Sequence, residues 1–189
     1  MTKTLKIIET KLPGVLIIEP QVFGDARGFF QETFSAKRYA EAGINEAFVQ
    51  DNHSRSGRGV LRGLHYQRSQ PQGKLVYVTR GEVFDVVVDI RRGSPTYGQH
   101  ASIVLNDANH QQFYAPPGYA HGFCVLSDVA DFVYKCTDYY HPTSEHGVLW
   151  NDPQLAIEWP LKDVLLSEKD KKNSPLRDIK PEDLPEYAS

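Results

Sequence analysis

Residues 60–67 read VLRGLHYQ, an apolar run that carries an arginine, a glycine and a histidine. Aliphatic and aromatic residues of this kind form buried or half-buried strands, and a glycine inside a strand indicates a bulge or a close approach by another group. If the side chains alternate strictly along the strand, His65 and Arg62 lie on opposite faces of it. Because burying an unpaired charge or imidazole costs free energy, both side chains need partners. This stretch alone leaves a structural and a catalytic histidine equally open.

The composition indicates one globular domain. The chain has 189 residues, 40% of them hydrophobic and 24% charged, which is enough for a substantial core. A formal net charge of -3 gives no electrostatic case for a nucleic-acid or membrane-surface partner. Neither a long apolar span nor a signal-peptide pattern is present, so a cytoplasmic protein is expected. The cysteines, Cys124 and Cys136, are expected to be reduced and buried.

Short apolar runs separated by Pro, Gly, Asn and Asp predict an all-β sandwich or barrel. The strongest hairpin signal is Arg80-Gly81-Glu82 between the runs 74–79 and 83–90. Residues 54–59 are expected to form a basic loop. Further strands are expected at 15–18, 46–52, 101–105, 111–114, 122–126, 131–137 and 147–151.

Helices are expected to be few and short. Residues 35–42 predict one, with Ser35 as its N-cap and Gly43 at its end. A second is expected at 167–172, capped by Ser167, and residues 175–189 predict an irregular arm.

Two carboxylates share one face of the run 83–90. Asp85 and Asp89 lie opposite the apolar face that begins with Phe84. Such a pair can serve as a metal or acid/base site, but solvation on an edge strand or pairing with an arginine is the commoner reason for it.

Residues 115–122 read APPGYAHG, a rigid turn that delivers His121 onto a strand. This turn is similar to that of small jelly-roll barrels of the cupin type, where the histidine often binds a metal. A cupin metal site needs further ligands, and the region around His65 supplies only one histidine. We therefore expect a metal-free barrel with both histidines facing its interior.

Neither a Walker-type loop nor a dinucleotide glycine motif is present. A phosphorylated ligand would have to be held by cationic side chains, and Arg27, Arg62 and Lys74 are the candidates. Of these three, Arg62 is the least typical of a solvated surface charge, because it lies inside an apolar stretch of sequence. Tyr134 could act as a general acid if it faces a histidine base across the barrel, which suits removal of a proton from one face of a carbon and its return to the other.

Taken together, the motifs resemble one family along most of the chain, from about Pro13 to about Asp170. They are FGDARGFF at 23–30, QDNHS at 50–54, LRGLHYQ at 61–67, GKLV at 73–76, GEVFDV at 81–86, VDIR at 88–91, PGYAHGF at 117–123 and WNDP at 150–153. The family that these motifs resemble is that of the dTDP-4-dehydrorhamnose 3,5-epimerases.

The resemblance implies a cupin-like jelly roll in one domain, with its core at about 13–151 and short helices and an irregular arm at 152–189. It implies a homodimer without a cofactor that inverts carbons 3 and 5 of dTDP-4-dehydro-6-deoxy-D-glucose in dTDP-L-rhamnose biosynthesis, which feeds polysaccharide synthesis. The implied catalytic residues are His65 as base, Tyr134 as acid, Asp170 to orient the histidine, and Lys74 beside the developing enolate.

For the nucleotide sugar, the resemblance implies a second set of residues, with Tyr140 stacking on thymine. The others are Arg27, Glu32, Gln50, Asn52, Arg62, His121, Glu145 and Lys169. On an ideal strand the side chains of Arg62 and His65 point to opposite faces. We therefore expect either a bulge near Gly63 or contact of one of them with the ligand of a neighbouring site.

Three alternatives remain open at this point. A single-carbon epimerase of the same nucleotide sugar differs in the number of carbons that exchange a proton with solvent. A metal-dependent cupin oxygenase needs ligands beyond His65 and His121. A non-catalytic nucleotide-sugar sensor has no use for the combination of His65, Asp170 and Tyr134.

Overall fold

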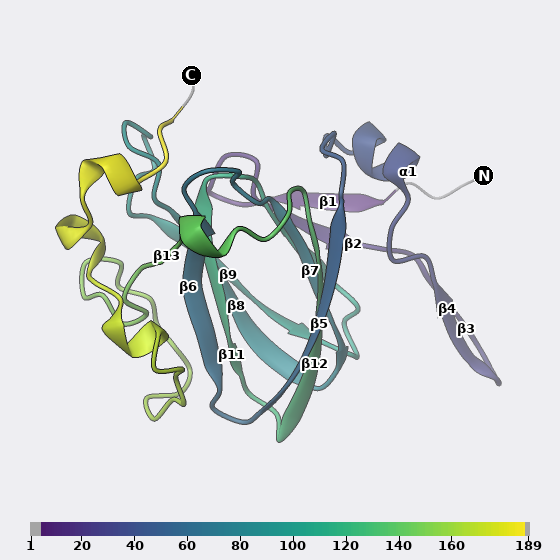
Figure 1. The fold of residues 1–189 in the computed structure, drawn as a ribbon. Coiled ribbons are helices and arrows are strands. Elements are labelled where there is room, and N and C mark those ends of the chain that lie inside the picture. Colours follow the sequence, from purple (N-terminus) through teal and green to yellow (C-terminus); the bar gives the residue numbers. More distant parts are fainter. Residues whose placement is uncertain (1–4, 188–189) are drawn as a thin grey trace.

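Two antiparallel β-sheets face each other in the computed structural model, which describes residues 5–187 (Figure 1). The six-stranded sheet contains, in spatial order, β1 (Lys6–Glu9), β2 (Leu16–Glu19), β10 (Gln112–Ala115), β7 (Lys74–Arg80), β12 (Val129–Cys136) and β5 (Gln50–Gly57). The five-stranded sheet contains β13 (Glu145–Gly147), β6 (Leu61–Gln67), β11 (Tyr119–Val125), β8 (Glu82–Asp89) and β9 (His100–Asn106). The predicted all-β, jelly-roll sandwich is confirmed.

The link at Arg80-Gly81-Glu82 is not a hairpin, and that prediction was wrong. β7 pairs with β10 and β12, whereas β8 pairs with β11 and β9, so the chain passes from one sheet to the other at Gly81. Val78 and Val83, on either side of the link, belong to the same inter-sheet core. Turn residues between two apolar runs cannot distinguish this crossing from a hairpin, because the strands' hydrogen-bond partners come from distant parts of the chain.

The basic loop expected at residues 54–59 is also largely strand. β5 pairs with β12 along its whole length, from Gln50 opposite Cys136 to Gly57 opposite Val129. Its side chains alternate between outward-facing, exposed positions and inward-facing, more buried ones. Because both sets are polar, the sequence carries no apolar period that would reveal the strand.

Apolar side chains form three separate clusters. The largest fills the space between the sheets and includes Phe113 and Phe132. A second lies between the outer face of the five-stranded sheet and the C-terminal segment, whose Leu155, Leu176 and Leu184 are buried there. The third packs the helix α1 (Ala36–Glu41) on the outer face of the six-stranded sheet. Both sheets are therefore covered on their outer faces, and the space between them is only partly filled by the first cluster, which leaves room for a pocket.

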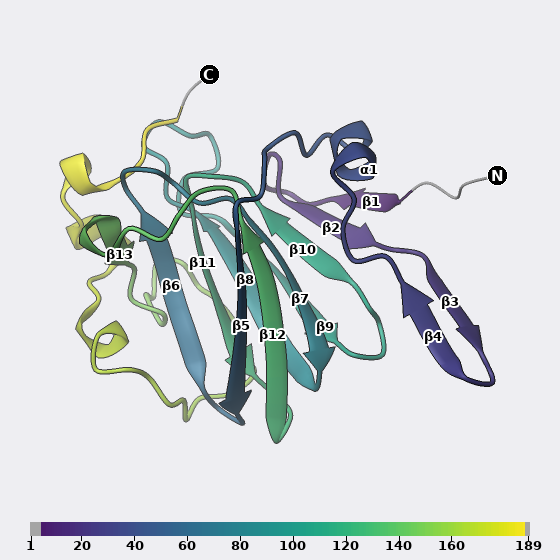
Figure 2. The same ribbon diagram turned by 45° about the vertical axis from the view of Figure 1, so that its right-hand side comes forward.

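A two-stranded hairpin projects from the sandwich next to α1. It consists of β3 (Val22–Asp25) and β4 (Gly28–Gln31), and Figures 1 and 2 show it extending beyond the edge of the six-stranded sheet. Phe23, Phe29 and Phe30 are each more than half exposed on it. Three exposed aromatic rings on one short hairpin form an apolar surface of the kind that marks an interface.

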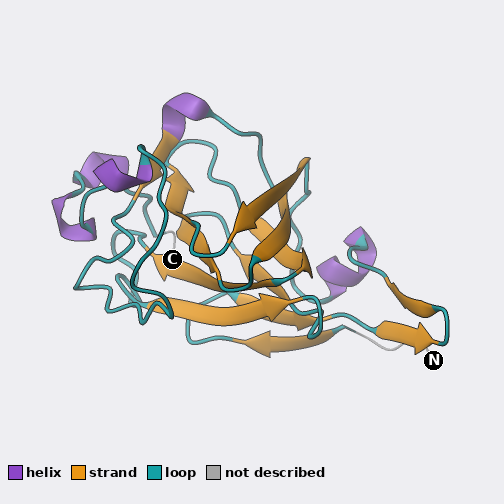
Figure 3. Cartoon of the chain, turned by 90° about the horizontal axis from the view of Figure 1, so that it is seen from below, coloured by secondary structure: helices purple, strands orange, loops and turns teal. Residues whose placement is uncertain are grey.

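Helical elements lie at the periphery of the strands (Figure 3). The predicted helix at 35–42 is confirmed as α1; Ser35 occupies the N-cap position without a side-chain hydrogen bond. The strand expected at 147–151 lies earlier, at β13. Within residues 5–187 there are also four 3₁₀ turns: η1 (Pro142–Ser144), η2 (Asp170–Lys172), η3 (Leu176–Asp178) and η4 (Pro181–Asp183). Within the described part of the chain, no helix is long and apolar enough to cross a membrane.

The C-terminal segment is less regular than a helix and better packed than a free arm. The helix expected at 167–172 is a single 3₁₀ turn, η2, although the Ser167 Oγ does accept a hydrogen bond from the Asp170 N–H at 3.1 Å. The predicted irregular arm contains two 3₁₀ turns between residues 175 and 187, and residues 188–189 lie outside the described part. Burial of Leu176 and Leu184 fixes this segment against the sheet.

Candidate active site

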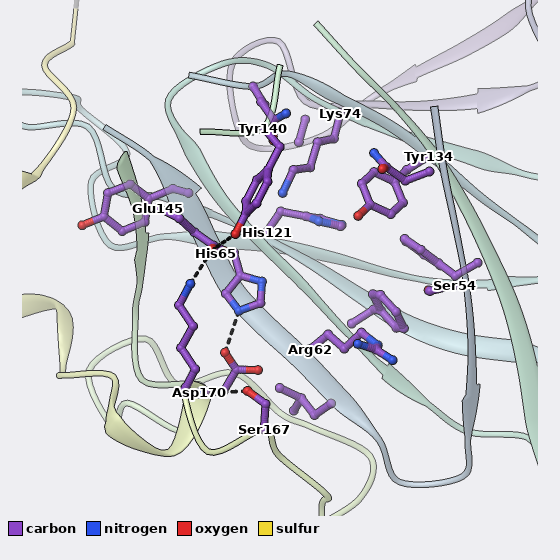
Figure 4. Close-up of a pocket in the computed structure, with 18 of the residues that line it drawn as sticks. Ser54, Arg62, His65, Lys74, His121, Tyr134, Tyr140, Glu145, Ser167 and Asp170 are labelled. Carbon is purple, nitrogen blue, oxygen red and sulfur yellow. Dashed lines mark hydrogen bonds and ion pairs between the residues drawn. The ribbon is translucent and has the colours of Figure 1, made fainter. Parts of the chain in front are cut away.

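A cavity of about 710 Å³ opens between the two sheets. One wall comes from β5, β7 and β12, the opposite wall from β6 and β11, and the rim from Tyr140, Glu145 and the segment around Asp170 (Figure 4). All four predicted catalytic residues line it: His65, Lys74, Tyr134 and Asp170. Of the predicted substrate-binding residues, seven line it: Gln50, Asn52, Arg62, His121, Tyr140, Glu145 and Lys169.

His65 and Asp170 form a close pair although 105 residues separate them. The His65 Nε2 lies 2.6 Å from the Asp170 Oδ1, and the Asp170 side chain is only 4% exposed. Burial alone would raise the pKa of Asp170, but hydrogen bonds from His65, Ser167 and the Gly63 N–H outweigh it and hold that pKa below the ordinary value. Since an ionised carboxylate only accepts hydrogen bonds, Nε2 carries the hydrogen of the neutral imidazole.

The predicted bulge near Gly63 is confirmed. His121 lies opposite His65 and Phe123 lies opposite Arg62, so two residues of β6 face the single residue Gly122 of β11. Gly63 has φ +128°, and a Cβ there would lie 2.6 Å from the Gly122 Cα. Only glycine fits this close approach, and the extra residue turns Arg62 toward the same pocket as His65.

His121 forms the second histidine–aspartate pair of the pocket. Its Nε2 lies 2.8 Å from the Asp85 Oδ1, and its ring stacks on Phe132 at 6.2 Å between centroids. Complete burial of Asp85 raises the pKa of its carboxyl, which His121 and Lys74 offset only in part. The predicted inward orientation of both histidines is confirmed.

The two carboxylates of β8 have different partners. Asp89 is paired with an arginine, as expected for the commoner case: it accepts hydrogen bonds from the Arg91 Nε at 2.9 Å and Nη2 at 2.7 Å. Asp85 is paired with a histidine instead. Solvation on an edge strand was the wrong explanation for both, because β8 lies between β11 and β9 and both side chains are fully buried.

Lys74 and Tyr134 approach from the sheet opposite His65. They lie on the inner faces of β7 and β12, where Tyr134 is opposite Val76 and Lys74 is opposite Cys136. Burial lowers the pKa of the Lys74 ammonium, although Cys136, Glu145 and Asp85 favour its charge. Burial raises the pKa of the Tyr134 hydroxyl, which therefore stays protonated at neutral pH. Figure 4 shows both polar ends pointing into the cavity.

The rim of the pocket carries a connected polar group. The Tyr140 hydroxyl donates to the Glu145 Oε2 at 2.6 Å, and the Lys169 ammonium contacts the same oxygen. Gln50 accepts the Tyr140 N–H at 3.0 Å and donates to the Asn52 Oδ1 at 3.1 Å. Half of the Tyr140 ring is exposed, so one of its faces is available to a flat ligand.

Arg62 is exposed within the mouth of the pocket and is not enclosed in the core. Its Nε and Nη2 donate to the Ser56 Oγ at 3.1 and 3.0 Å, which fixes the guanidinium while leaving other donors free. An arginine in this setting can bind a phosphate.

Arg27 and Glu32 do not lie in this pocket. Arg27 occupies the tip of the β3–β4 hairpin, where its side chain is 89% exposed and pairs with Asp25. Glu32 pairs with Arg38 at 3.0 Å beside the same hairpin. The projecting hairpin holds both side chains away from their own chain's cavity.

The pocket also contains side chains that the sequence did not single out. Ser54 lines it, and its buried hydroxyl has no hydrogen-bond partner. Ser54 follows Gln50 and Asn52 at intervals of two, so recognising β5 as a strand would have found it. Phe123 and Leu165 contribute apolar surface, and Ser167 lies beside Asp170.

Both cysteines are free and buried, as predicted. Within residues 5–187, no group of three or more His, Cys, Asp and Glu side chains is arranged to hold a metal ion.

Comparison with known proteins connects this pocket with a family of sugar-nucleotide enzymes. The family model for dTDP-4-dehydrorhamnose 3,5-epimerase matches residues 9–178. A dTDP-4-dehydrorhamnose 3,5-epimerase of Pseudomonas aeruginosa is 54% identical over 176 residues, which cover 92% of this chain and 97% of that protein. One of Methanothermobacter thermautotrophicus is 52% identical over 176 residues, with coverage of 92% and 95%.

Among solved structures, a dTDP-6-deoxy-D-glucose 3,5-epimerase from Legionella pneumophila is similar over the whole fold. It superposes with a TM-score of 0.96 at 58% identity, covering 98% of this chain and all of that one. That protein was crystallised in complex with dTDP-4-keto-L-rhamnose.

Proposed function

The chain belongs to the dTDP-4-dehydrorhamnose 3,5-epimerase family, and we propose that His65, Tyr134, Lys74 and Asp170 carry out its reaction. The activity is the inversion of carbons 3 and 5 of dTDP-4-dehydro-6-deoxy-D-glucose, giving dTDP-4-dehydro-L-rhamnose in dTDP-L-rhamnose biosynthesis. One observation supports the residue roles above all: the His65–Asp170 pair and the Tyr134 hydroxyl enter one cavity from opposite sheets.

His65 is the base in this proposal. Carbons 3 and 5 both adjoin the carbon 4 ketone, so removal of either hydrogen leaves an enolate. With the His65 Nε2–H donating to ionised Asp170, the other ring nitrogen, Nδ1, holds the lone pair, and in Figure 4 it points toward the centre of the cavity. Asp170 stabilises the imidazolium that forms when Nδ1 takes the proton.

Lys74 stabilises the enolate oxygen. A fixed ammonium in a partly buried site lowers the barrier by favouring the negative charge that develops on oxygen 4. Its charge is supported by Asp85 and Glu145, even though burial lowers its pKa. The side chain points into the space between the two catalytic walls (Figure 4).

Tyr134 is the acid that completes each inversion. Inversion requires the proton to leave one face of the carbon and another to arrive on the opposite face. Because His65 and Tyr134 belong to facing sheets, a sugar ring between them presents one face to each. The raised pKa of Tyr134 keeps the proton on its hydroxyl until the enolate carbon takes it.

The nucleotide is bound along the rim and mouth of the cavity. The exposed Tyr140 ring stacks on thymine, and Arg62, held by Ser56, pairs with the diphosphate. The remaining residues proposed to bind the substrate are Gln50, Asn52, His121, Glu145 and Lys169.

We propose a homodimer in which the β3–β4 hairpin reaches the neighbouring pocket. The hairpin projects with three exposed phenylalanines, and Arg27 at its tip is far more exposed than the pocket residues. In this arrangement Arg27 and Glu32 complete the substrate site of the other protomer.

We further propose that the enzyme works in the cytoplasm and needs no cofactor. The two free, buried thiols suit a reducing compartment. The acid–base pair and the ammonium supply each proton transfer and the charge stabilisation that the reaction requires. Dialysis against a metal chelator is therefore expected to leave kcat unchanged, and recovery of lost activity by one added metal would contradict this.

Incubating the enzyme with dTDP-4-dehydro-6-deoxyglucose in deuterium oxide tests the proposal. We expect deuterium at carbons 3 and 5, located by proton NMR, and capture of the product as dTDP-L-rhamnose by a reductase. Label at one carbon only would assign the chain to the single-carbon epimerases, which are the alternative within the same chemistry. Absence of label at both carbons would refute the proposed roles.

A further inference from the structure

Asp170 is held by an irregular segment and not by a sheet. It begins the single turn η2, after a stretch of turns and coil beyond β13 in which a bridge between Leu165 and Val60 is the last backbone link to the sheet before Asp170. Coil of this kind constrains a side chain less than a strand does. Even so, the carboxylate lies 2.6 Å from His65 and is almost completely buried. Groups outside the pair must therefore fix its position.

Ser167 is the first such group. Its Oγ accepts the Asp170 N–H at 3.1 Å and its carbonyl accepts the Lys171 N–H at 3.1 Å, so both of its polar groups secure the turn that carries the aspartate. The Ser167 side chain also helps to lower the pKa of the Asp170 carboxyl. Ser167 itself is exposed at the edge of the pocket, so no packing requirement explains it.

The second group is the backbone N–H of Gly63. The register shift between β6 and β11 falls at this residue, and the Gly63 N–H helps to lower the pKa of the Asp170 carboxyl. A bulged residue does not pair in the ladder, so its N–H is available to another acceptor. The same bulge therefore aims Arg62 into the pocket and provides a donor for the partner of His65.

We propose that the Ser167 Oγ and the Gly63 N–H are positioning groups that hold Asp170 so that His65 keeps its hydrogen on Nε2 and its lone pair on Nδ1. This inference rests on the proposed function for its catalytic consequence, but the tautomer itself is a property of the free enzyme. Without the Ser167 Oγ, the aspartate moves away from Nε2 and the hydrogen is shared between the two ring nitrogens. Proton abstraction then slows. Of the groups proposed to bind the nucleotide, Lys169 lies in this segment, and its ammonium is held separately by Glu145.

The variants Ser167→Ala and Ser167→Thr separate the hydroxyl from the rest of the side chain. Because Ser167 is exposed, neither substitution disturbs the core. Glu168→Gln is the matched control: it changes the next residue of the same segment, whose exposed side chain pairs with Lys171 at 2.6 Å and not with Asp170.

The first readout is the tautomer of His65 in the free enzyme, from long-range proton–nitrogen NMR of nitrogen-15 histidine-labelled protein above the titration of the ring. His65→Gln identifies the signals. We expect a pure Nε2–H tautomer in the wild type, in Ser167→Thr and in Glu168→Gln, and averaged nitrogen shifts in Ser167→Ala. A pure Nε2–H tautomer in Ser167→Ala would overturn the proposal.

The second readout is solvent-deuterium exchange into the substrate. In Ser167→Ala we expect kcat to fall about 10- to 100-fold with KM nearly unchanged, since a small misplacement of a catalytic group has effects of that size. Ser167→Thr should recover most of the loss, and an equal loss in that variant would overturn the role of Oγ. If the wild type shows no exchange while the tautomers differ as expected, the proposed function fails and the positioning role stands.

Discussion

At the scale of single residues, the surroundings of Asp170 and of Tyr134 in the pocket favour opposite protonation states. Asp170 stays ionised beside His65 because several donors hold its pKa low, and Tyr134 keeps its proton because burial raises its pKa. Two titratable groups whose environments push them toward opposite protonation states form a base and an acid at the same pH.

Replacing either group should affect a different half of the inversion. His65→Ala is expected to lower deuterium exchange at both carbons by about 10²- to 10⁴-fold, the usual contribution of a positioned base. Tyr134→Phe should slow the completed inversion more than the initial exchange, because abstraction precedes reprotonation. Both effects are measured by proton NMR in deuterium oxide. Undiminished exchange in His65→Ala, or equal losses of exchange and inversion in Tyr134→Phe, would contradict the assigned roles.

The proposed role of Lys74 predicts how the rate changes at high pH. Its pKa is lowered from 10.5 by burial, and the protonated form is the one proposed to stabilise the enolate, so kcat should fall as pH rises through this lowered pKa. The pKa of Tyr134 is raised above 10.0, so Tyr134 stays protonated in that window and does not cause the decline. Lys74→Arg should move the alkaline limb to higher pH because arginine does not titrate there. A limb at the same pH in both enzymes would refute this assignment.

At the scale of secondary-structure elements, two glycines place the walls of the site. Gly63 allows β6 to shift register against β11, and Gly81 allows the chain to cross from β7 to β8. Gly81 has φ +78° and packs against the Val129 carbonyl and Ser127 in the opposite turn. Each position requires a glycine for its dihedral angles and for the absence of a Cβ.

Gly81→Ala is expected to lower the free energy of unfolding by about 2 to 5 kcal/mol, from left-handed strain together with overlap with the Val129 carbonyl. Gly93→Ala is the control, since Gly93 has a similar φ of +82° but no neighbouring atom within 4 Å of the point where a Cβ would lie. Strain alone should cost about 1 kcal/mol there. Urea denaturation followed by circular dichroism compares the two, and equal losses would show that the inter-sheet crossing is not tightly packed.

At the scale of the whole molecule, the C-terminal segment and the β3–β4 hairpin lie on opposite sides of the protein, and the pocket lies between the two sheets. The C-terminal segment covers the outer face of the five-stranded sheet, and the hairpin extends beyond the six-stranded one (Figure 2). A chain organised in this way cannot bring Arg27 to its own His65. The single domain spanning residues 1–189 stays a prediction.

Mixing two defective variants tests the shared site. Arg27→Ala and His65→Ala enzymes, each weak alone, are unfolded together and refolded. If Arg27 of the partner subunit serves each pocket, half of the dimers are mixed and one of their two sites is complete, so about a quarter of wild-type activity should return. Recovery of no activity, with a dimer shown by light scattering, would mean that the hairpin does not reach the neighbouring pocket.

Local features of the sequence were enough to predict the β-rich class and the two inward histidines, and the resemblance of the motifs predicted the chemistry of the site. Alternation and turn residues are local properties, and residue types such as His65, Lys74 and Tyr134 carry their acid–base character wherever they lie. The bulge near Gly63 was one of two possibilities once the resemblance placed both Arg62 and His65 at the substrate, because residues three apart on a regular strand face opposite sides.

The folded structure was needed to show which segments meet. Asp170 reaches His65 from 105 residues away, Ser54 joins the pocket on a strand without apolar residues, and the link at Gly81 joins two sheets instead of closing a hairpin. Arg27, which looked like a pocket residue, is carried away on the hairpin. These outcomes depend on strand pairing and burial between residues that are distant in the sequence. Pairing and burial satisfy backbone hydrogen bonds and cover apolar surface over the whole chain, so they leave little trace in any one stretch of sequence.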